Sequence, residues 1–195
     1  MMRKSVVERN TLETKIKAEL NLDGKGNTEI NTGIGFFDHM LNGFAKHGLF
    51  DLKLKIDGDL NVDGHHSVED CGIVIGQAIK EAIGDKKGIR RFGYFILPMD
   101  DALALVSIDL GGRPYLDFQC EFPAEKCGEF ETNLVREFFY ALSYSAMMNI
   151  HVKMLSGINS HHMAEAVFKA FAKALDEATG IDPRIEGVAS TKGVI

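Results

Sequence analysis

Apolar and polar residues alternate along several short stretches of this chain, and such alternation is typical of β-strands with one buried and one exposed face. Residues 12–22 are the clearest case, because Ile16, Ala18 and Leu20 alternate there with charged and amide side chains. The Asp-Gly-Lys-Gly sequence that follows predicts a hairpin turn, so the next strand is expected to return beside this one. In the first half of the chain, strands are predicted at 3–9, 12–22, 27–31 and 50–56.

Other segments carry apolar residues three or four positions apart, which is the spacing of one face of an amphipathic α-helix. Met40 and Phe44, for example, lie on one such face of residues 36–46. The same spacing predicts helices at about 65–83, 132–148 and 161–179.

The second half of the chain repeats the order of elements in the first half. Its strands are predicted at 93–97, 102–110, 115–122 and 150–155, with a loop at 123–129. Each half thus has three strands, a helix, a strand and a helix, which indicates an internal duplication. Two repeats, at about 1–88 and 89–180, and a tail at 181–195 predict a single α+β domain with two four-stranded sheets and helices packed between or against them.

Composition and charge narrow the functional classes. The 195 residues carry a net charge of −6, which argues against a nucleic-acid-binding surface. No run of about 18 apolar residues indicates a membrane span, and the N-terminal residues lack the apolar core of a signal peptide. Cys71, Cys120 and Cys127 are odd in number and form no CxxC pair, which predicts reduced thiols and a cytoplasmic protein.

The sequence HHSVE at 65–69 recurs as HHMAE at 161–165, each time at the start of a predicted helix. A histidine and a glutamate four positions apart lie on one helix face and can share a metal ion. Adjacent histidines point about 100° apart around the helix, so the two imidazoles of each motif are expected to serve different ions. A single motif is also consistent with surface or capping residues, and its duplication is what favours a pair of divalent cations such as Mn, Fe, Co or Zn.

Three further histidines leave alternatives open. His39, at the head of the first long helix, is either a buried, hydrogen-bonded histidine or a metal ligand whose ring Asp38 orients. His47, at the other end of that helix, is either a C-terminal cap or a site residue. His151 stands where the first half has Lys53, so it breaks the repeat and marks either an added function or surface drift.

Charged side chains elsewhere give weaker signals. Glu13 and Asp101 occupy equivalent positions in the two halves, and Glu13 becomes a candidate general acid–base only beside a metal ion. Arginine, lysine, serine and backbone N–H groups together are what a phosphate group requires. Candidates of this kind, which are otherwise ordinary solvated charges, are Arg90, Arg91, Arg113, Lys169 and the STKG sequence at 190–193.

With these motifs in place, the chain resembles the imidazoleglycerol-phosphate dehydratase family of histidine biosynthesis from Arg9 to its C-terminal residue. The matching sequences are RNTLET at 9–14, TGIGFFDHML at 32–41, HGLFD at 47–51, DGHHSVED at 63–70, KGIRRFG at 87–93, GRP at 112–114, HHMAE at 161–165, FKA at 168–170 and STKG at 190–193. The resemblance implies a fold like that of ribosomal protein S5 domain 2. It also implies a single-function form without a fused phosphatase domain, and a homo-oligomer of 24 subunits with active sites between subunits.

The resemblance further implies a cytoplasmic enzyme with two manganese ions that dehydrates imidazole glycerol phosphate to imidazole acetol phosphate. The proton to be removed lies beside no carbonyl, so the metal-bound imidazole of the substrate must itself expel the neighbouring hydroxyl. The implied metal ligands are His39, His65, His66, Glu69, His151, His161, His162 and Glu165, with Glu13 as the catalytic acid–base. The implied substrate contacts are Glu13, His47, Arg91, Arg113, Lys169, Ser190 and Lys192.

Helix geometry adds a hypothesis about how these ligands divide between the two ions. His65 and Glu69 are expected on one ion and His161 and Glu165 on the other, with His66 and His162 each crossing to the opposite ion.

Two other functions would also use paired metal ions. A two-metal phosphoesterase would release inorganic phosphate with the same ions and cations. A metal-storage or scaffold protein would bind metal without turnover. All three interpretations predict no nucleic-acid or membrane partner, and the two enzymes predict a small phosphate-bearing substrate.

Overall fold

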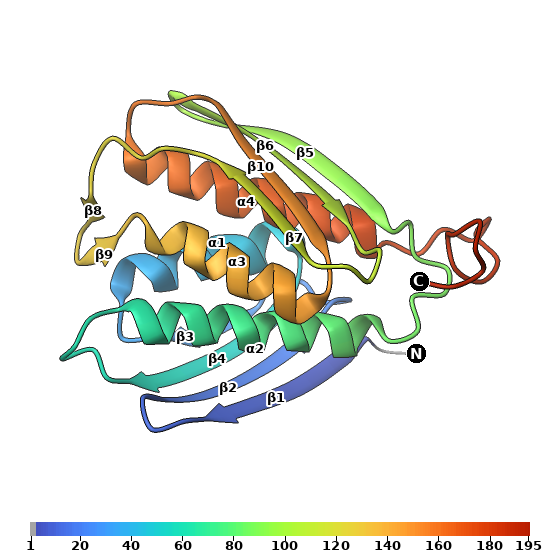
Figure 1. Cartoon of the computed structure of the whole chain (residues 1–195), viewed down its shortest axis with the longest axis horizontal. Helices are drawn as coiled ribbons and strands as arrows, with labels where there is room; N and C mark the ends of the chain where they lie inside the picture. The colour runs from blue at the N-terminus through green and yellow to red at the C-terminus, as the bar shows by residue number, and fades with distance from the viewer. Residues whose placement is uncertain (1–2) are drawn as a thin grey trace.

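The computed structural model describes residues 3–195, in which two four-stranded sheets enclose a layer of four helices (Figure 1). The helices are α1 (Gly35–Gly48), α2 (His65–Ile83), α3 (Leu134–Ala146) and α4 (Ser160–Thr179). This arrangement confirms the α+β class and the two four-stranded sheets expected from the sequence. Residues 1 and 2, with which the expected first repeat begins, lie outside the described part of the chain.

The two sheets have the same strand order, as a duplicated chain should. The first sheet is β1-β2-β4-β3 and the second is β5-β6-β10-β7. The strands of the first are β1 (Lys4–Asn10), β2 (Thr14–Asn21), β3 (Thr28–Asn31) and β4 (Asp51–Gly58). Those of the second are β5 (Phe92–Met99), β6 (Ala102–Asp109), β7 (Tyr115–Gln119) and β10 (Asn149–Ser156).

The predicted hairpin between β2 and β3 is wrong. β2 pairs with β1 and β4, and β3 lies parallel to β4 on the far edge of the sheet. The reason is that α1 connects β3 to β4, and a helical crossover is the connection that makes neighbouring strands parallel. The second half repeats this geometry, since β7 pairs in parallel with β10 across α3.

The segment predicted as a loop at 123–129 contains a small second hairpin. Its strands are β8 (Lys126–Cys127) and β9 (Phe130–Glu131), and Gly128 supplies the positive φ of +61° that their turn requires. The strand before it ends at Gln119, earlier than the predicted residue 122. No helix within residues 3–195 has the combination of length and apolar content that crossing a membrane requires.

The core lies between the inner faces of the sheets and the helical layer. Along β2, buried Ile16, Ala18 and Leu20 face the helices, which confirms the alternation seen in the sequence. Phenylalanine rings from α3 and α4 interlock at the centre, with Phe138 and Phe168 centroids 5.3 Å apart. This packing holds the helices against one another and so determines where their first turns lie.

Helices α2 and α3 pack closely because α2 presents glycine to its partner. A Cβ atom on Gly72 would lie 2.5 Å from the carbonyl oxygen of Phe138, which is backbone and cannot rotate away. Gly76, one turn later, meets the carbonyl of Leu142 in the same way. The two repeats therefore contact each other backbone to backbone along this seam.

We expect Gly72→Ala to lower the free energy of unfolding by about 1–3 kcal/mol, because the added methyl overpacks the α2–α3 seam. Gly43→Ala is the matched control, since a Cβ at Gly43 in α1 meets nothing within 4 Å. That variant should be neutral or gain up to about 1 kcal/mol from helix propensity. Urea denaturation of both variants measures the difference. Equal stability of Gly72→Ala and wild type would show that α2 and α3 do not pack so closely that Gly72 is required.

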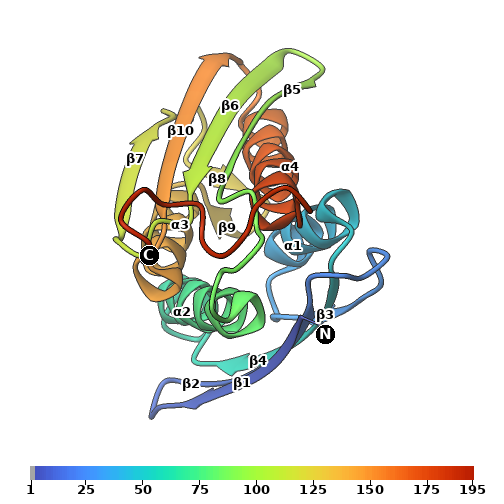
Figure 2. The same cartoon turned by 90° about the vertical axis from the view of Figure 1, so that its right-hand side faces the viewer.

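The tail packs against the body of the protein. Gly88 N–H donates to the carbonyl of Gly187, and Asp182 N–H donates to the carbonyl of Gly88. Ile89 and Ile181 also form an isolated bridge. Figure 2 shows this segment, in red, crossing the end of the molecule where the second sheet begins. Residues 181–195 are thereby placed at the C-terminal end of α4.

Candidate active site

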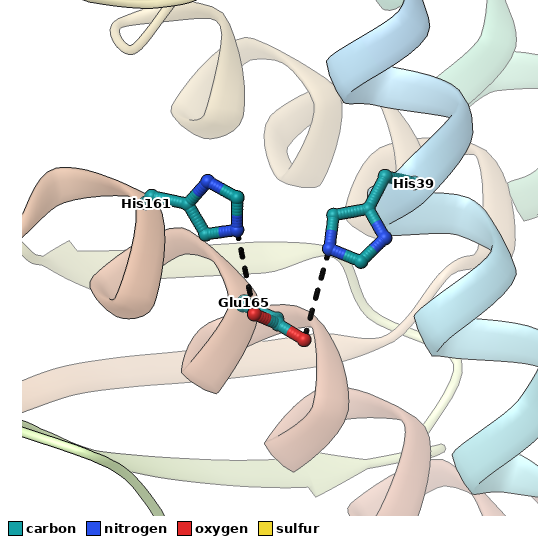
Figure 3. A group of neighbouring side chains, drawn as sticks. All are labelled: His39, His161 and Glu165. Atoms are coloured by element: carbon teal, nitrogen blue, oxygen red, sulfur yellow. Dashed lines mark ion pairs between the residues drawn. The ribbon is translucent and has the colours of Figure 1, made fainter.

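Three candidate metal ligands meet where α1 packs on α4 (Figure 3). The Nε2 atom of His161 lies 3.5 Å from Oε2 of Glu165, and Nε2 of His39 lies 3.8 Å from Oε1 of the same carboxylate. The cap of α4 positions this group, since Asn159 Oδ1 accepts a hydrogen bond from the backbone N–H of His161. His39 is half exposed, so the structure excludes the alternative of a buried histidine.

The donor atoms of this group suit one divalent ion. Nitrogen and oxygen ligands bind such ions at about 2.0–2.2 Å, so two ligands of one ion lie no more than about 4.4 Å apart. The histidine–glutamate distances of 3.5 and 3.8 Å satisfy that limit. All three donor atoms lie within 4.8 Å of one another, so only a small side-chain adjustment would be needed to bring them around one ion. Two imidazoles with one carboxylate is a set that borderline cations such as Mn, Fe, Co and Zn accept.

Lys169 lies one turn further along α4 and adds positive charge beside this group. Its Nζ atom is 2.7 Å from Oε1 of Glu165, whose side chain is 11% exposed. Burial raises the pKa of Glu165, but the hydrogen bond and charge of Lys169 outweigh it, so the pKa falls below its ordinary value. The carboxylate is therefore ionised at neutral pH, with Oε1 paired with Lys169 and Oε2 facing His161. Burial and the charge of Lys169 also lower the pKa of His47, which lies in the last turn of α1.

The first histidine motif has its own acidic surroundings. His65 Nε2 lies 4.0 Å from Glu69 Oε2, across one turn of α2. His66 Nδ1 lies 3.0 Å from Asp59 Oδ2, and its Nε2 lies 3.7 Å from Oε1 of Glu13. The hydrogen bond with Asp59 raises the pKa of His66.

A buried carboxylate fixes the turn that carries Glu13. Asp70 of α2 accepts hydrogen bonds from Thr14 Oγ1 at 2.5 Å and from Arg9 Nε at 2.9 Å. The hydroxyl of Thr11 accepts from the backbone N–H of Glu13 at 3.1 Å. Glu13 itself keeps a 54% exposed side chain, so its backbone is held while its carboxylate reaches solvent.

The remaining histidines of the second half are paired with aspartates. His162 Nδ1 lies 2.6 Å from Asp101 Oδ1, a hydrogen bond that raises the pKa of His162. His151, on the outer face of β10, has its Nδ1 3.5 Å from Asp117 Oδ2 of the neighbouring strand β7.

Five of the substrate contacts that the resemblance implies could hold a phosphate, and four of them line one cleft of about 810 Å³ at the opposite end of the molecule: Arg91, Arg113, Ser190 and Lys192. Arg90, a further candidate from the sequence, does not line this cleft. The guanidinium of Arg91 is oriented by Asp109, with Nε 2.7 Å from Oδ1, and by the carbonyl of Ala189. The fifth candidate, Lys169, does not line this cleft. It lies beside Glu165.

Within the described residues 3–195, only His39, His161 and Glu165 come together as a group of three potential metal ligands. His65, His66 and Glu69 lie at the start of α2. His151 lies on β10, and the ring of His162, whose centroid is 6.0 Å from that of His161, is not part of the group. Both histidine motifs begin their helices at the same end of the layer, at the left of Figure 1, and the tail lies at the other end. The division of ligands between two ions stays a prediction.

The structure also shows contacts that sequence reasoning missed or misplaced. The rings of His66 and His162 are held by Asp59 and Asp101, and no local spacing marks either pair because both partners lie on separate loops. Asp38, expected to orient the ring of His39, instead accepts from the N–H and hydroxyl of Thr32. The only sequence feature that drew attention to Asp101 was its equivalence to Glu13 in the repeat, and nothing in the sequence pointed to Asp59.

Comparison with known proteins gives consistent matches. The family model of imidazoleglycerol-phosphate dehydratase matches residues 32–175. The imidazoleglycerol-phosphate dehydratases of Lachnoclostridium phytofermentans and Acetivibrio thermocellus are 63% and 60% identical to this chain over 195 residues, covering 100% of both chains in each case. The crystal structure of the Staphylococcus aureus enzyme has 40% identity and a TM-score of 0.83, covering 93% of this chain and 100% of its own. The Pyrococcus furiosus structure, in complex with (S)-C348, has 39% identity and a TM-score of 0.84, covering 97% of this chain and 100% of its own.

Proposed function

The chain belongs to the imidazoleglycerol-phosphate dehydratase family, and we propose from this premise that it dehydrates its substrate with two divalent cations held between neighbouring subunits. Family membership makes it a hydro-lyase of histidine biosynthesis, acting on imidazoleglycerol phosphate. The ions, their ligands and the assembly are the proposed part. Manganese is the proposed ion, and the cytoplasm is the proposed location.

One observation carries the metal proposal, namely the group formed by His39, His161 and Glu165 where α1 meets the start of α4. The duplicated motif at the start of α2 supplies a comparable histidine and glutamate, His65 and Glu69, 4.0 Å apart. The group at α1 and α4 would supply three ligands of one ion, and the motif at the start of α2 would supply a histidine and a glutamate to the other. The remaining proposed ligands are His66, His151 and His162.

The distance between the two candidate binding regions supports a site shared between subunits. Arg91 lies beside the C-terminal end of α4, because its N–H donates to the carbonyl of Ala178. At about 1.5 Å per helical residue, Ala178 is about 25 Å from His161 along the helix axis. An imidazole joined to a three-carbon phosphate is much shorter than that. A phosphate held by Arg91, Arg113, Ser190 and Lys192 would therefore approach the metal ligands of another subunit.

The outer faces of the two sheets support self-association through the second one. On the first sheet the outward residues of β2 and β4 include Lys15, Lys17, Lys53 and Lys55. On the second sheet the corresponding face exposes Phe92 (56%), Tyr94 (65%), Ile96 (49%) and Tyr115 (54%). Phe92, Tyr94 and Ile96 lie two positions apart on one face of β5, and Tyr115 lies on β7 at the other edge of the sheet. Exposed apolar side chains grouped as they are along β5 mark protein interfaces. An assembly of 24 subunits is the proposed form.

Each group of candidate site residues has a separate role in the proposed dehydration. Divalent ions bound at the histidine motifs would act as Lewis acids that stabilise negative charge on the substrate imidazole. The histidines and glutamates would hold these ions in place. Glu13 accepts the proton from the carbon chain, and the threonine and aspartate contacts of its turn keep its backbone in place. The cationic cleft holds the phosphate, and the His47 ring, whose pKa is lowered, offers a neutral contact beside Lys169.

Metal removal tests this proposal directly. Exhaustive chelation is expected to abolish turnover, and added Mn²⁺ is expected to restore it, with a ketone product that retains its phosphate. Carbonyl detection and ³¹P NMR of the product measure both properties. A two-metal phosphoesterase would instead release inorganic phosphate, and a storage or scaffold protein would bind metal with no turnover. Full activity after complete metal removal would exclude the proposed mechanism.

A further inference from the structure

In both repeats, the Nδ1 atom of the second histidine of the motif lies within hydrogen-bond distance of a carboxylate from outside its own helix. His66 Nδ1 lies 3.0 Å from Oδ2 of Asp59, which follows β4. His162 Nδ1 lies 2.6 Å from Oδ1 of Asp101, which precedes β6. The first histidines of the motifs, His65 and His161, instead face the glutamates of their own helices.

A carboxylate partner determines which ring nitrogen can bind a cation. An ionised carboxylate only accepts hydrogen bonds, so the Nδ1 atom that faces it carries the hydrogen. The lone pair of the neutral ring is then on Nε2, on the far side of the imidazole. In both repeats Nε2 points toward acidic surroundings, 3.7 Å from Glu13 for His66 and 3.5 Å from Asp100 for His162.

The two repeats reach this arrangement with different aspartates. β4 (Asp51–Gly58) matches β10 (Asn149–Ser156), so the residue after each strand is Asp59 in the first repeat and Gly157 in the second. A Cβ at Gly157 would lie 2.6 Å from Cγ of Met163, so an aspartate there would have to displace the buried Met163 side chain. Asp101 makes the equivalent contact from the turn between β5 and β6.

Asp101 occupies the position that Glu13 has in the first repeat, but its carboxylate is fully engaged. Its Oδ2 accepts the backbone N–H groups of Ile158 and Asn159 at 2.6 and 3.0 Å, while Oδ1 holds His162. Glu13 has no such hydrogen bonds to its carboxylate among the described residues. The two equivalent positions therefore differ in role, because the carboxylate of Asp101 is held by hydrogen bonds and that of Glu13 is not.

We propose that Asp59 and Asp101 are positioning residues, which hold His66 and His162 with Nδ1 protonated and Nε2 free to bind a divalent cation. This inference rests on the proposed function, because it requires that the histidine motifs bind metal. Carboxylate partners of this kind set both the tautomer and the orientation of metal-binding histidines. Neither aspartate need touch the substrate.

The test replaces each carboxylate by an amide. In Asp101→Asn the side-chain oxygen can still accept from Ile158 and Asn159, whereas the amide NH₂ faces Nδ1 and favours the opposite tautomer of His162. We expect Mn²⁺ affinity to fall by about 10–100-fold at the affected site, with unchanged thermal stability of the chelated protein. Asp59→Asn should give the same loss for the site that His66 serves. Titration with Mn²⁺, with free ion detected by electron paramagnetic resonance, measures affinity and stoichiometry.

Glu177→Gln is the matched control, since Glu177 accepts the backbone N–H of Tyr94 and its variant should bind Mn²⁺ as the wild type does. Wild-type affinity in Asp101→Asn and Asp59→Asn would overturn the positioning role while leaving the proposed function intact. A chelated Asp101→Asn protein that melts as early as Asp101→Ala would also overturn it, because the loss would then come from the loop before α4. A wild type that binds no Mn²⁺ would overturn both proposals.

Discussion

Glu13→Gln is expected to lower kcat by about 10²–10⁴-fold while leaving Mn²⁺ binding and assembly unchanged. Glutamine has nearly the same shape as glutamate but cannot accept a proton at pH 7. The turn should keep its conformation, because it is held by Thr11, Thr14 and Asp70 rather than by the Glu13 carboxylate. Steady-state kinetics and metal analysis of the purified variant measure the two properties separately.

A matched control for this substitution is Glu8→Gln on β1. Glu8 is exposed, and its one ion pair within residues 3–195 is with Lys17, at 2.9 Å. A surface ion pair of this kind contributes about 0–1 kcal/mol. Its kcat should therefore stay at the wild-type value. Loss of metal in Glu13→Gln would show that Glu13 is a ligand and not the proton acceptor. Retention of full turnover would remove Glu13 from the mechanism.

Removing His161 is expected to have the second large effect, because His161→Ala takes one of two imidazoles from the group with His39 and Glu165. Partners that only orient metal ligands contribute about 10–100-fold to affinity, so loss of a direct ligand should weaken Mn²⁺ binding by more than about 100-fold at that site. Turnover should fall below detection at micromolar Mn²⁺. If the ions also join subunits, the solution mass of the variant should decrease.

Mn²⁺ titration and light scattering, each with and without chelator, measure these changes. Lys173→Ala is a suitable control on the same helix, since Lys173 pairs with Asp176 and stands away from the ligand group. It should leave both affinity and mass unchanged. Wild-type metal binding in His161→Ala would show that the group at α1 and α4 is not an ion site. A variant that binds no metal but keeps the wild-type solution mass would show that assembly does not depend on bound metal.

Much of the fold followed from local patterns. The period-two burial of β2 and the helical spacing in 36–46 are set by backbone geometry, so they are visible in any short window of sequence. The duplication was also visible, because equivalent elements keep their order even where loop lengths differ. The histidine and glutamate of each motif could be placed on one helix face for the same reason.

Strand pairing could not be predicted from the turn alone. The Asp-Gly-Lys-Gly sequence after β2 is a strong turn signal, yet β3 pairs with β4 and not with β2. The crossover through α1, which buries Phe37 and Phe44, outweighs the local preference for a hairpin. The short β8–β9 hairpin was missed because two-residue strands carry no readable periodicity.

The same distinction between local pattern and tertiary packing applies to the candidate site. The sequence by itself determined the element types, the duplication, the family and the identity of the candidate ligands, since these depend on residue type and on spacing within a single helix or strand. Only the tertiary structure decided that His39 joins His161 and Glu165, that Asp59 and Asp101 hold His66 and His162, and that Lys169 lies apart from the cationic cleft. Those contacts join residues from different elements, and their distances are set by how the helices pack between the two sheets.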